Sequence, residues 1–204
     1  MIAQDFAKAV GGTLAHVTAA RNLPAIERDG LRSAEALARR AELSADDIIL
    51  RKVRQRVGEA TLNHQLPILH GITAAARVLD GHTPASWAAQ LDRRIFFWPI
   101  SKLAKFRDSI QRDFDTDVIH IDALAFAETF FDHIDLCALN SGNFTQGGAH
   151  AVRGDWIYSP LTAGLPAFRN LRRDRGLVKT TDTIKEVSLR CPVPAETLAA
   201  LRVH

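Results

Sequence analysis

His16 and Thr18 are the first residues whose types and spacing could bind a ligand. They stand two positions apart in the short apolar alternation Thr13–Thr18, which predicts a β-strand. Residues two apart on a strand project from the same face, so the imidazole and the hydroxyl could hold one polar group of a ligand. Spacing alone favours the alternative that both side chains are satisfied inside the protein core.

Other kinds of catalytic site find little support in the sequence. The chain has eight histidines but no His-Glu-x-x-His segment, so we expect no metal. Ser141 belongs to an Asn-Ser-Gly turn and not to a Gly-x-Ser-x-Gly elbow, and Gly147-Gly148 lacks the lysine of a phosphate-binding loop. A zinc protease, an α/β-hydrolase and a nucleotide hydrolase are therefore poor interpretations.

Basic residues are concentrated toward the end of the chain. The formal net charge is +3, and residues 147–204 hold nine basic and five acidic groups. Between Phe144 and Thr183 no hydrophobic period is sustained, so we predict a long basic loop over residues 144–183. Its cations alternate with aromatic rings, a composition that binds phosphate backbones and stacks unpaired bases. We expect substrate contacts, with nucleic acid slightly ahead of protein and a merely solvated loop as the alternative, from Arg153, Trp156, Tyr158, Arg172 and Arg173.

The remaining patterns predict an α+β protein in which helices come early and strands are concentrated later. The predicted strands are Thr13–Thr18, Arg94–Trp98, Asp117–Ile121, Ile134–Leu139 and Ile184–Cys191. The predicted helices are Leu23–Asp29, Ala34–Ala41, Ala45–Val57, Pro84–Leu91, Ser101–Arg112, Asp122–Phe131 and Pro194–Leu201. The expected capping residues are Asn22, Ser33, Ser44 with Asp47, Thr83 and Asp122 at N-termini, and Gly30 in the left-handed conformation at a C-terminus.

Length and composition indicate one globular domain over residues 1–204. Of these 204 residues 47% are hydrophobic and 24% charged, which is average for globular proteins, and a chain of this length can bury one large core. No apolar run reaches about 18 residues, and the first residues lack the pattern of a secretory signal, so we expect no membrane contact and a cytoplasmic location. Cys137 and Cys191 lie in apolar runs and are expected to be free thiols.

The segment His16–Leu31 (HVTAARNLPAIERDGL) resembles the opening of DarT-type ADP-ribosyltransferases, an H-x-T strand followed in the same register by N-L, I and G-L. More of the chain is similar to a related, poorly characterised bacterial family. The motifs that carry this likeness are Asp80–Pro84 (DGHTP) with Trp87, Arg93–Trp98 (RRIFFW) and Asn140–Gly142 (NSG). The likeness spans most of the chain, and His16–Leu31 and Arg93–Trp98 are its more specific parts.

The resemblance implies the split β-sandwich of these transferases with an N-terminal helical portion, and NAD bound in a cleft as co-substrate. It also implies a catalytic glutamate on a late apolar strand, after a recognition loop and shortly before a proline. Glu186, followed by Pro192, fits that position. By itself, Glu186 could equally lie on the solvated face of an edge strand, paired with Lys185 or Arg190. The NAD contacts implied by the resemblance are His16, Thr18, Asn22, Arg94, Ser141 and Asn143, the last standing where DarT has a histidine.

The arginine that binds the NAD phosphates in DarT-type enzymes has no unique counterpart. Its candidates are Arg51, Arg54, Arg56 and Arg94. In the related family an Arg-Asp-Gln precedes a proline, where this chain reads Asn63-His64-Gln65-Leu66-Pro67. An asparagine does not replace the bidentate contact of a guanidinium.

The function implied by the resemblance is NAD-dependent ADP-ribosylation of a nucleic acid or a protein. A role as a toxin, and an antitoxin protein as partner, come from the resemblance alone. One rival keeps the fold without the transfer: the cleft binds a nucleotide and the arginine-rich loop docks RNA or DNA. A second rival is a structural or regulatory protein.

Overall fold

The computed structural model describes residues 1–65, 79–104, 115–142, 152–177 and 183–203. The strands are β1 (Thr13–Ala19), β2 (Gln55–Val57), β3 (Ala60–Leu62), β4 (Ile95–Pro99), β5 (Thr116–Asp122), β6 (Ile134–Cys137), β7 (Tyr158–Pro160) and β8 (Glu186–Leu189). Six of them form an antiparallel sheet in the order β5-β1-β4-β8-β6-β7, and β2 and β3 form a separate hairpin. The protein is therefore α+β, as predicted.

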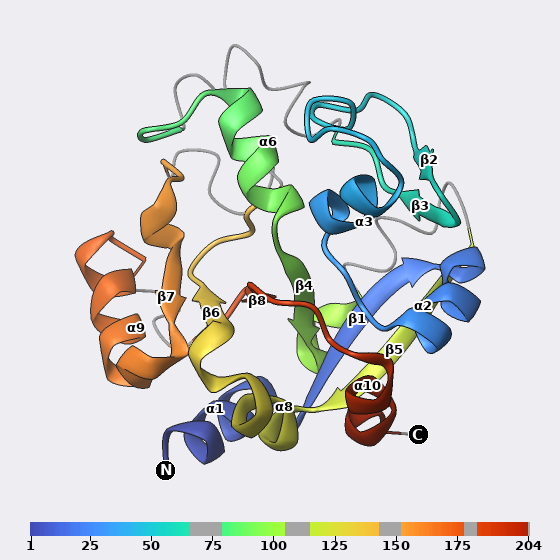
Figure 1. Ribbon diagram of the computed structural model, residues 1–204. Helices are drawn as coiled ribbons and strands as arrows, with labels where there is room; N and C mark the ends of the chain where they lie inside the picture. Colours follow the sequence, from blue (N-terminus) through green and yellow to red (C-terminus); the bar gives the residue numbers. More distant parts are fainter. Residues whose placement is uncertain (66–78, 105–114, 143–151, 178–182, 204) are drawn as a thin grey trace.

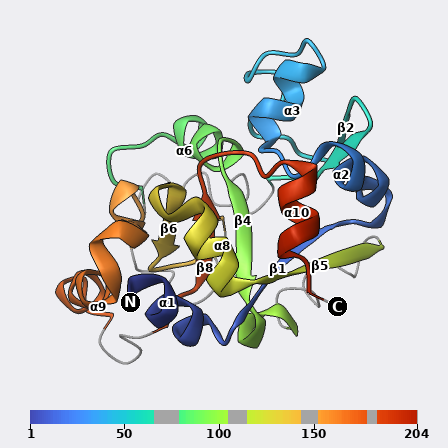
Figure 2. The same ribbon diagram turned by 60° about the horizontal axis from the view of Figure 1, so that its bottom comes forward.

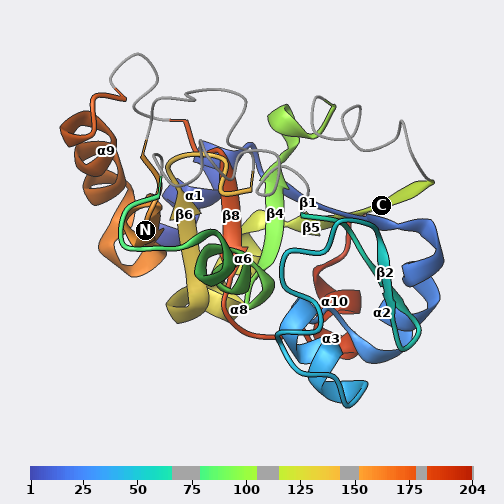
Figure 3. The same cartoon turned by 90° about the horizontal axis from the view of Figure 1, so that it is seen from above.

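Helices cover both faces of the sheet. They are α1 (Ile2–Val10), α2 (Leu23–Asp29), α3 (Ala34–Arg40), α6 (Pro84–Asp92), α8 (Ala123–Phe130), α9 (Gly164–Asp174) and α10 (Ala195–Leu201), with one-turn 3-10 helices at Ala20–Asn22, Phe131–His133, Asp155–Ile157 and Leu161–Ala163. Figures 1 and 2 show α1, α8 and α10 on one side of the sheet. Seen from above, α6 lies on the other side, in front of β4 and β8 (Figure 3).

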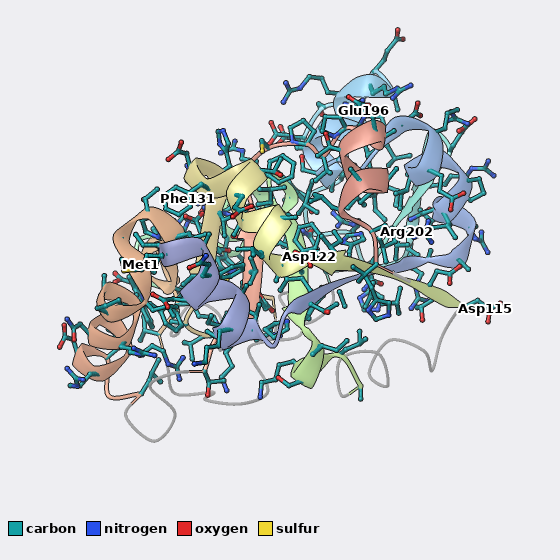
Figure 4. All side chains as sticks on the ribbon, turned by 90° about the horizontal axis from the view of Figure 1, so that it is seen from below. Met1, Asp115, Asp122, Phe131, Glu196 and Arg202 are labelled. Atoms are coloured by element: carbon teal, nitrogen blue, oxygen red, sulfur yellow. The ribbon has the colours of Figure 1, made fainter. Side chains whose placement is uncertain are left out.

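The two ends of the sheet carry different elements. Figure 1 shows α2, α3 and the β2–β3 hairpin gathered at the end formed by β1 and β5, and α9 at the far end beside β7. The main core fills the space between the sheet and α1 and α8, where the ring centroid of Phe126 lies 4.9 Å from that of Phe97 and 5.4 Å from that of Phe130. Asp122 joins β5 to α8 (Figure 4), and its Oδ1 accepts the helix-capping hydrogen bond from the Ala125 N–H at 2.8 Å.

Strand β4 divides its hydrogen bonds between two neighbours. Its first three residues pair with β8, and its last two pair with Leu14 and Ala15 of β1. Beyond Ala15, β1 stays paired with β5 but leaves β4. There the His16 Nδ1 lies 3.0 Å from the Phe96 carbonyl oxygen, so a side chain of β1 takes the place of a ladder bond. The sheet therefore opens between β1 and β4 at His16.

Most predicted elements are confirmed, with shorter ends for β6 and β8. The helix predicted at Pro84–Leu91 has its capping box, in which Thr83 and Ser86 exchange hydrogen bonds. Helix α1 was not predicted. Of the helix predicted at Ser101–Arg112, residues 101–104 are helical and the others lie outside the described residues.

The helix predicted at Ala45–Val57 is wrong. Ser44 and Asp47 do form the capping box, with the Ser44 N–H donating to the Asp47 carboxylate at 2.7 Å. The chain then makes turns instead of a helix, because Leu50 adopts a left-handed φ of 56° and its N–H donates to the Gln65 side chain at 2.6 Å. A local capping signal is thus overridden by a contact fifteen residues away.

The irregular loop predicted over residues 144–183 is wrong where the structure describes it, since residues 158–160 form β7 and residues 164–174 form α9. Gly30 is also corrected. Its φ is positive (81°), but its ψ of −177° is extended and not left-handed helical, because the chain turns there to bridge Leu31 to Val193 through two 2.9 Å hydrogen bonds.

Replacing Gly30 by Ala should destabilise the protein strongly. A Cβ at Gly30 would overlap the Val193 carbonyl oxygen, whereas a Cβ at Gly12, which also has a positive φ (79°), meets nothing within 4 Å. We expect Gly30→Ala to lower the free energy of unfolding by about 3 kcal/mol or more, and Gly12→Ala by about 1–2 kcal/mol, the cost of backbone strain alone. Urea denaturation measures both, and equal losses would contradict this reading of the Gly30 turn.

Candidate functional site

A cavity of about 480 Å³ lies where β1 leaves β4. Its walls come from β1, α2, α3 and the β2–β3 hairpin, with Trp98 contributed by β4. The volume falls within the ~300–1,000 Å³ of small-molecule sites. His16, Thr18 and Asn22 all line it, so the structure brings together three of the residues that the sequence grouped as ligand contacts.

Two of these polar residues are tied to their surroundings by hydrogen bonds. The Asn22 amide donates to the Thr18 hydroxyl (3.1 Å) and to the Thr61 carbonyl (3.0 Å), and its Oδ1 accepts from the Thr61 N–H (2.8 Å). Asn22 therefore links β1 to β3 and is not the side-chain cap of α2 that was predicted. Without the Asn22 side chain, neither the cavity wall at Thr18 nor the hairpin at Thr61 would keep these hydrogen bonds.

His16 is held as a hydrogen-bond acceptor toward the cavity. Burial lowers its pKa, against the opposing effect of the Phe96 carbonyl, so the imidazole is neutral at neutral pH. A carbonyl only accepts, so Nδ1 must carry the proton. The lone pair then lies on Nε2, which can accept a hydrogen bond from a ligand hydroxyl.

The cavity wall carries more positive than negative groups. It includes four arginines and two carboxylates, namely Arg28, Arg32, Arg40, Arg54, Asp29 and Glu59. Arg28 donates to Asp29 at 2.9 Å and to Glu59 at 2.5 Å, and both contacts raise its pKa. The surplus of cations suits an anionic ligand.

Arg54 is the one phosphate-binding candidate that lines this cavity. Arg51 instead makes a two-pronged contact with the Asp92 carboxylate, at 2.8 and 3.0 Å. Arg56 donates to the Gly58 carbonyl at 3.1 Å. Of the alternatives that the sequence left open, the geometry thus favours Arg54.

Glu186 is buried in the middle of the sheet. The residue is 3% exposed, and its Oε2 accepts hydrogen bonds from the Ser141 hydroxyl at 2.7 Å and the Ser141 N–H at 3.2 Å. Burial raises the pKa of Glu186 to about 7, against the opposing effects of Ser141 and Arg153. The solvated edge-strand alternative for Glu186 is wrong, because β8 lies between β4 and β6.

Glu186 and His16 lie on different sides of β4. The His16 ring contacts Phe97, with centroids 5.6 Å apart, and Phe97 pairs with Val187 of β8. Successive strand residues alternate between the two faces of the sheet, so Glu186, which precedes Val187, points to the face opposite that of Phe97. The described lining of the cavity does not include Glu186. Trp98 follows Phe97 and therefore shares the face of Glu186. It also lines the cavity, and so it marks the boundary between the cavity and the surroundings of Glu186.

Arg94 and Ser141, predicted as NAD contacts, belong to the Glu186 side of the sheet. Arg94 donates to Asp135 at 2.5 Å and to the Ser188 hydroxyl at 3.0 Å, and its guanidinium lies 3.8 Å from the centroid of the Tyr158 ring. Arg94 is thus engaged in an internal polar network. Asn143, the other predicted contact, lies outside the described residues.

Two of the five predicted substrate contacts are buried, and two more are half-buried. Arg153 and Arg172 are 0% and 1% exposed. Tyr158 stacks on Trp87 with centroids 6.0 Å apart, and the partly buried Trp156 lies under the Arg175 guanidinium. Arg173 alone of the five is exposed, and it donates to Asn170.

Of the five predicted substrate contacts, Arg153 and Arg172 are therefore corrected, because neither is available at the surface to bind a nucleic acid. The physical reason is that both guanidinium groups reach inward to main-chain carbonyls. Trp87, for which the sequence analysis gave no role beyond the DGHTP motif, packs over Tyr158. Its single indole N–H, which needs a partner when buried, was the available signal.

Two further kinds of site find no candidate in the described part of the chain. Among those residues, no three His, Cys, Asp or Glu side chains gather where they could hold a metal ion. Within the same residues, no helix has the length and apolar character needed to cross a membrane.

Glu186 should make the protein less stable as the pH rises. The native carboxyl, with a pKa of about 7, holds its proton more tightly than the unfolded one near 4.5, so stability is full below about pH 4.5 and is lost as pH rises through 7. We expect the free energy of unfolding to fall by about 3 kcal/mol more in the wild type than in Glu186→Gln between pH 4 and pH 8. Urea denaturation across this range gives both curves, and parallel curves would contradict the assignment.

A family model described as "Family of unknown function (DUF7002)" matches residues 12–199. The match runs from just before β1 almost to the end of α10, and so includes both the cavity and Glu186. No curated protein and no solved structure matches the chain. A chain matched over this much of its length belongs to the DUF7002 family.

Proposed function

We propose that the protein is an NAD-dependent ADP-ribosyltransferase in which the β1 cavity binds NAD and Glu186 acts on its ribose. The observation that carries the proposal is the opening of the sheet at His16. A neutral imidazole lies there beside a cavity with an excess of arginines, and a buried carboxylate lies two strands away.

The polar groups of the cavity match those of a dinucleotide. The His16 Nε2 can accept a hydrogen bond from a ribose hydroxyl, and the Thr18 hydroxyl can bind its neighbour. Arg32 and Arg54 supply cations for the pyrophosphate. Asp29 and Glu59 can accept hydrogen bonds from hydroxyl or amino groups of the adenosine half.

Transfer requires the carbon–nitrogen bond between ribose and nicotinamide to break, with its electron pair leaving on nicotinamide. Positive charge then develops on the ribose, and an ionised carboxylate stabilises that charge more than it stabilises bound NAD. The acceptor forms the new bond to the same carbon and gives up its proton, which Glu186 can take. For this the ribose must reach Glu186 past Trp98, the residue common to both sides.

A second candidate function is nucleotide binding without transfer. It is favoured by one observation, the burial of Glu186 outside the described lining of the cavity. In that case the cavity would bind NAD or a related nucleotide, and Glu186 would be purely structural.

Labelled NAD distinguishes these functions. We expect the purified protein to transfer label to single-stranded DNA, RNA or cell protein, each offered as a separate pool. Glu186→Gln should reduce transfer at least about 100-fold, the scale of losing one transition-state electrostatic contact. Glu128→Gln, the same change at an exposed carboxylate on α8, should leave transfer unchanged.

Calorimetric titration with NAD completes the test. His16→Ala should weaken NAD binding about tenfold, the equivalent of one hydrogen bond, while Glu186→Gln should leave binding within a few-fold. NAD binding with no transfer by the wild type would favour the binding module. Transfer undiminished in Glu186→Gln would remove Glu186 from the mechanism.

A further inference from the structure

We propose that Ser141 is a positioning residue for Glu186, and that Trp87, Arg153 and Arg172 hold Ser141 in place. The catalytic consequence of this inference rests on the proposed function, but the positioning itself does not. The segment concerned is residues 138–141, directly after β6.

Three buried side chains hold this segment by its carbonyl groups. Trp87, Arg153 and Arg172 are the largest fully buried side chains among the described residues. The Arg172 Nη1 donates to the Ala138 carbonyl, the Arg153 Nε to the Asn140 carbonyl (2.9 Å) and the Trp87 Nε1 to the Ser141 carbonyl (2.9 Å). All three donors therefore converge on four consecutive residues.

The three donors come from three parts of the fold. Trp87 lies on α6, Arg172 on α9, and Arg153 on the stretch that bridges to Leu79. Burying a guanidinium is unfavourable unless its N–H groups are satisfied, and a buried carbonyl left unpaired is unfavourable too. The two arginine contacts reduce both costs, and the Trp87 indole N–H pairs with a third carbonyl, so residues 138–141 are held by three parts of the fold.

Ser141 passes this fixed geometry to Glu186. Its N–H and its hydroxyl both donate to the same oxygen, Oε2, and hold the carboxylate in one orientation. Hydrogen bonds to the ionised form favour that form, so Ser141 opposes the rise in the pKa of Glu186 that burial causes. Ser141 thereby increases the fraction of Glu186 that is ionised near neutral pH.

The other ionisable groups around Glu186 do not replace this effect. Cys137 on β6 and Tyr158 on β7 have pKa values raised well above the ordinary ones by burial, so both are neutral. Arg153 adds a favourable charge, which lowers the pKa of Glu186 less than Ser141 does. Arg94 lies over Tyr158 and is paired with Asp135.

The same arrangement explains two sequence motifs that the cavity does not use. In the DGHTP motif, the ring of His82 packs edge-on against Trp87 at 5.1 Å between centroids, and its Nε2 lies 3.1 Å from the Asp155 carboxylate. The NSG motif supplies Ser141. The two motifs thus meet in the hydrogen bond from Trp87 to Ser141, residues that are 54 positions apart.

The test is to titrate Glu186 in the Ser141→Ala variant while its carboxyl carbon is observed by NMR. The Glu186 signal is assigned as the one that is missing in Glu186→Gln. Loss of the hydroxyl should move the midpoint of Glu186 upward by about one pH unit. Trp87→Phe, which keeps a ring but loses the N–H, should move it in the same direction by less. Ser159→Ala, the same change at a buried serine on β7, should leave it in place.

The pH dependence of the transfer rate supplies the second readout. We expect its midpoint to move upward in Ser141→Ala with the NMR value, with KM for NAD unchanged. The inference would be overturned if Ser141→Ala folds and Glu186 in it titrates with the wild-type midpoint. If Ser141→Ala does not fold, the same result in folded Trp87→Phe would overturn it. A shifted NMR midpoint in a protein that transfers no label to any pool would support the positioning and refute the proposed function.

Discussion

The burial of one carboxylate in the middle of the sheet constrains much of this fold. Glu186 can be 3% exposed only if donors reach it, and the strand ladder uses its main-chain groups without serving its side chain. Ser141 supplies those donors, and the segment that carries it needs partners for its carbonyls. Trp87 of α6 and Arg172 of α9 are two of these partners, so both helices are joined to the same segment.

A second constraint acts at the other end of β4. A strand that leaves its neighbour exposes main-chain groups, and the imidazole of His16 satisfies the Phe96 carbonyl where β1 departs. The space created there is walled by α2, α3 and the hairpin, which Asn22 ties to β1. Strand β4 therefore separates a cationic cavity from a buried carboxylate, and Trp98 is the β4 residue that borders both.

Local patterns predicted the elements whose stability is local. The helix after Thr83 and the alternating strands needed only capping, periodicity and β-branched or aromatic residues. Helix α9 was missed because its inward face runs Leu165, Phe168, Arg172, and an arginine at an inward position breaks the apolar period. The predicted helix at residues 45–57 failed for the converse reason, since a genuine capping box was followed by a distant contact that ended it.

The candidate site, like the fold, was predictable only where its residues are close together in the sequence. His16, Thr18 and Asn22 lie within seven residues, so a strand and the turn after it bring them together. Ser141 meets Glu186 across 45 positions, and no spacing rule reports such a meeting. Composition also counts charges without showing whether they are buried. Arg153 and Arg172 belong to the basic surplus of residues 147–204, yet they donate hydrogen bonds to main-chain carbonyls inside the protein. A cluster of arginines beside aromatic residues thus describes a buried scaffold as well as it describes a nucleic-acid surface, and only the direction of the side chains separates the two.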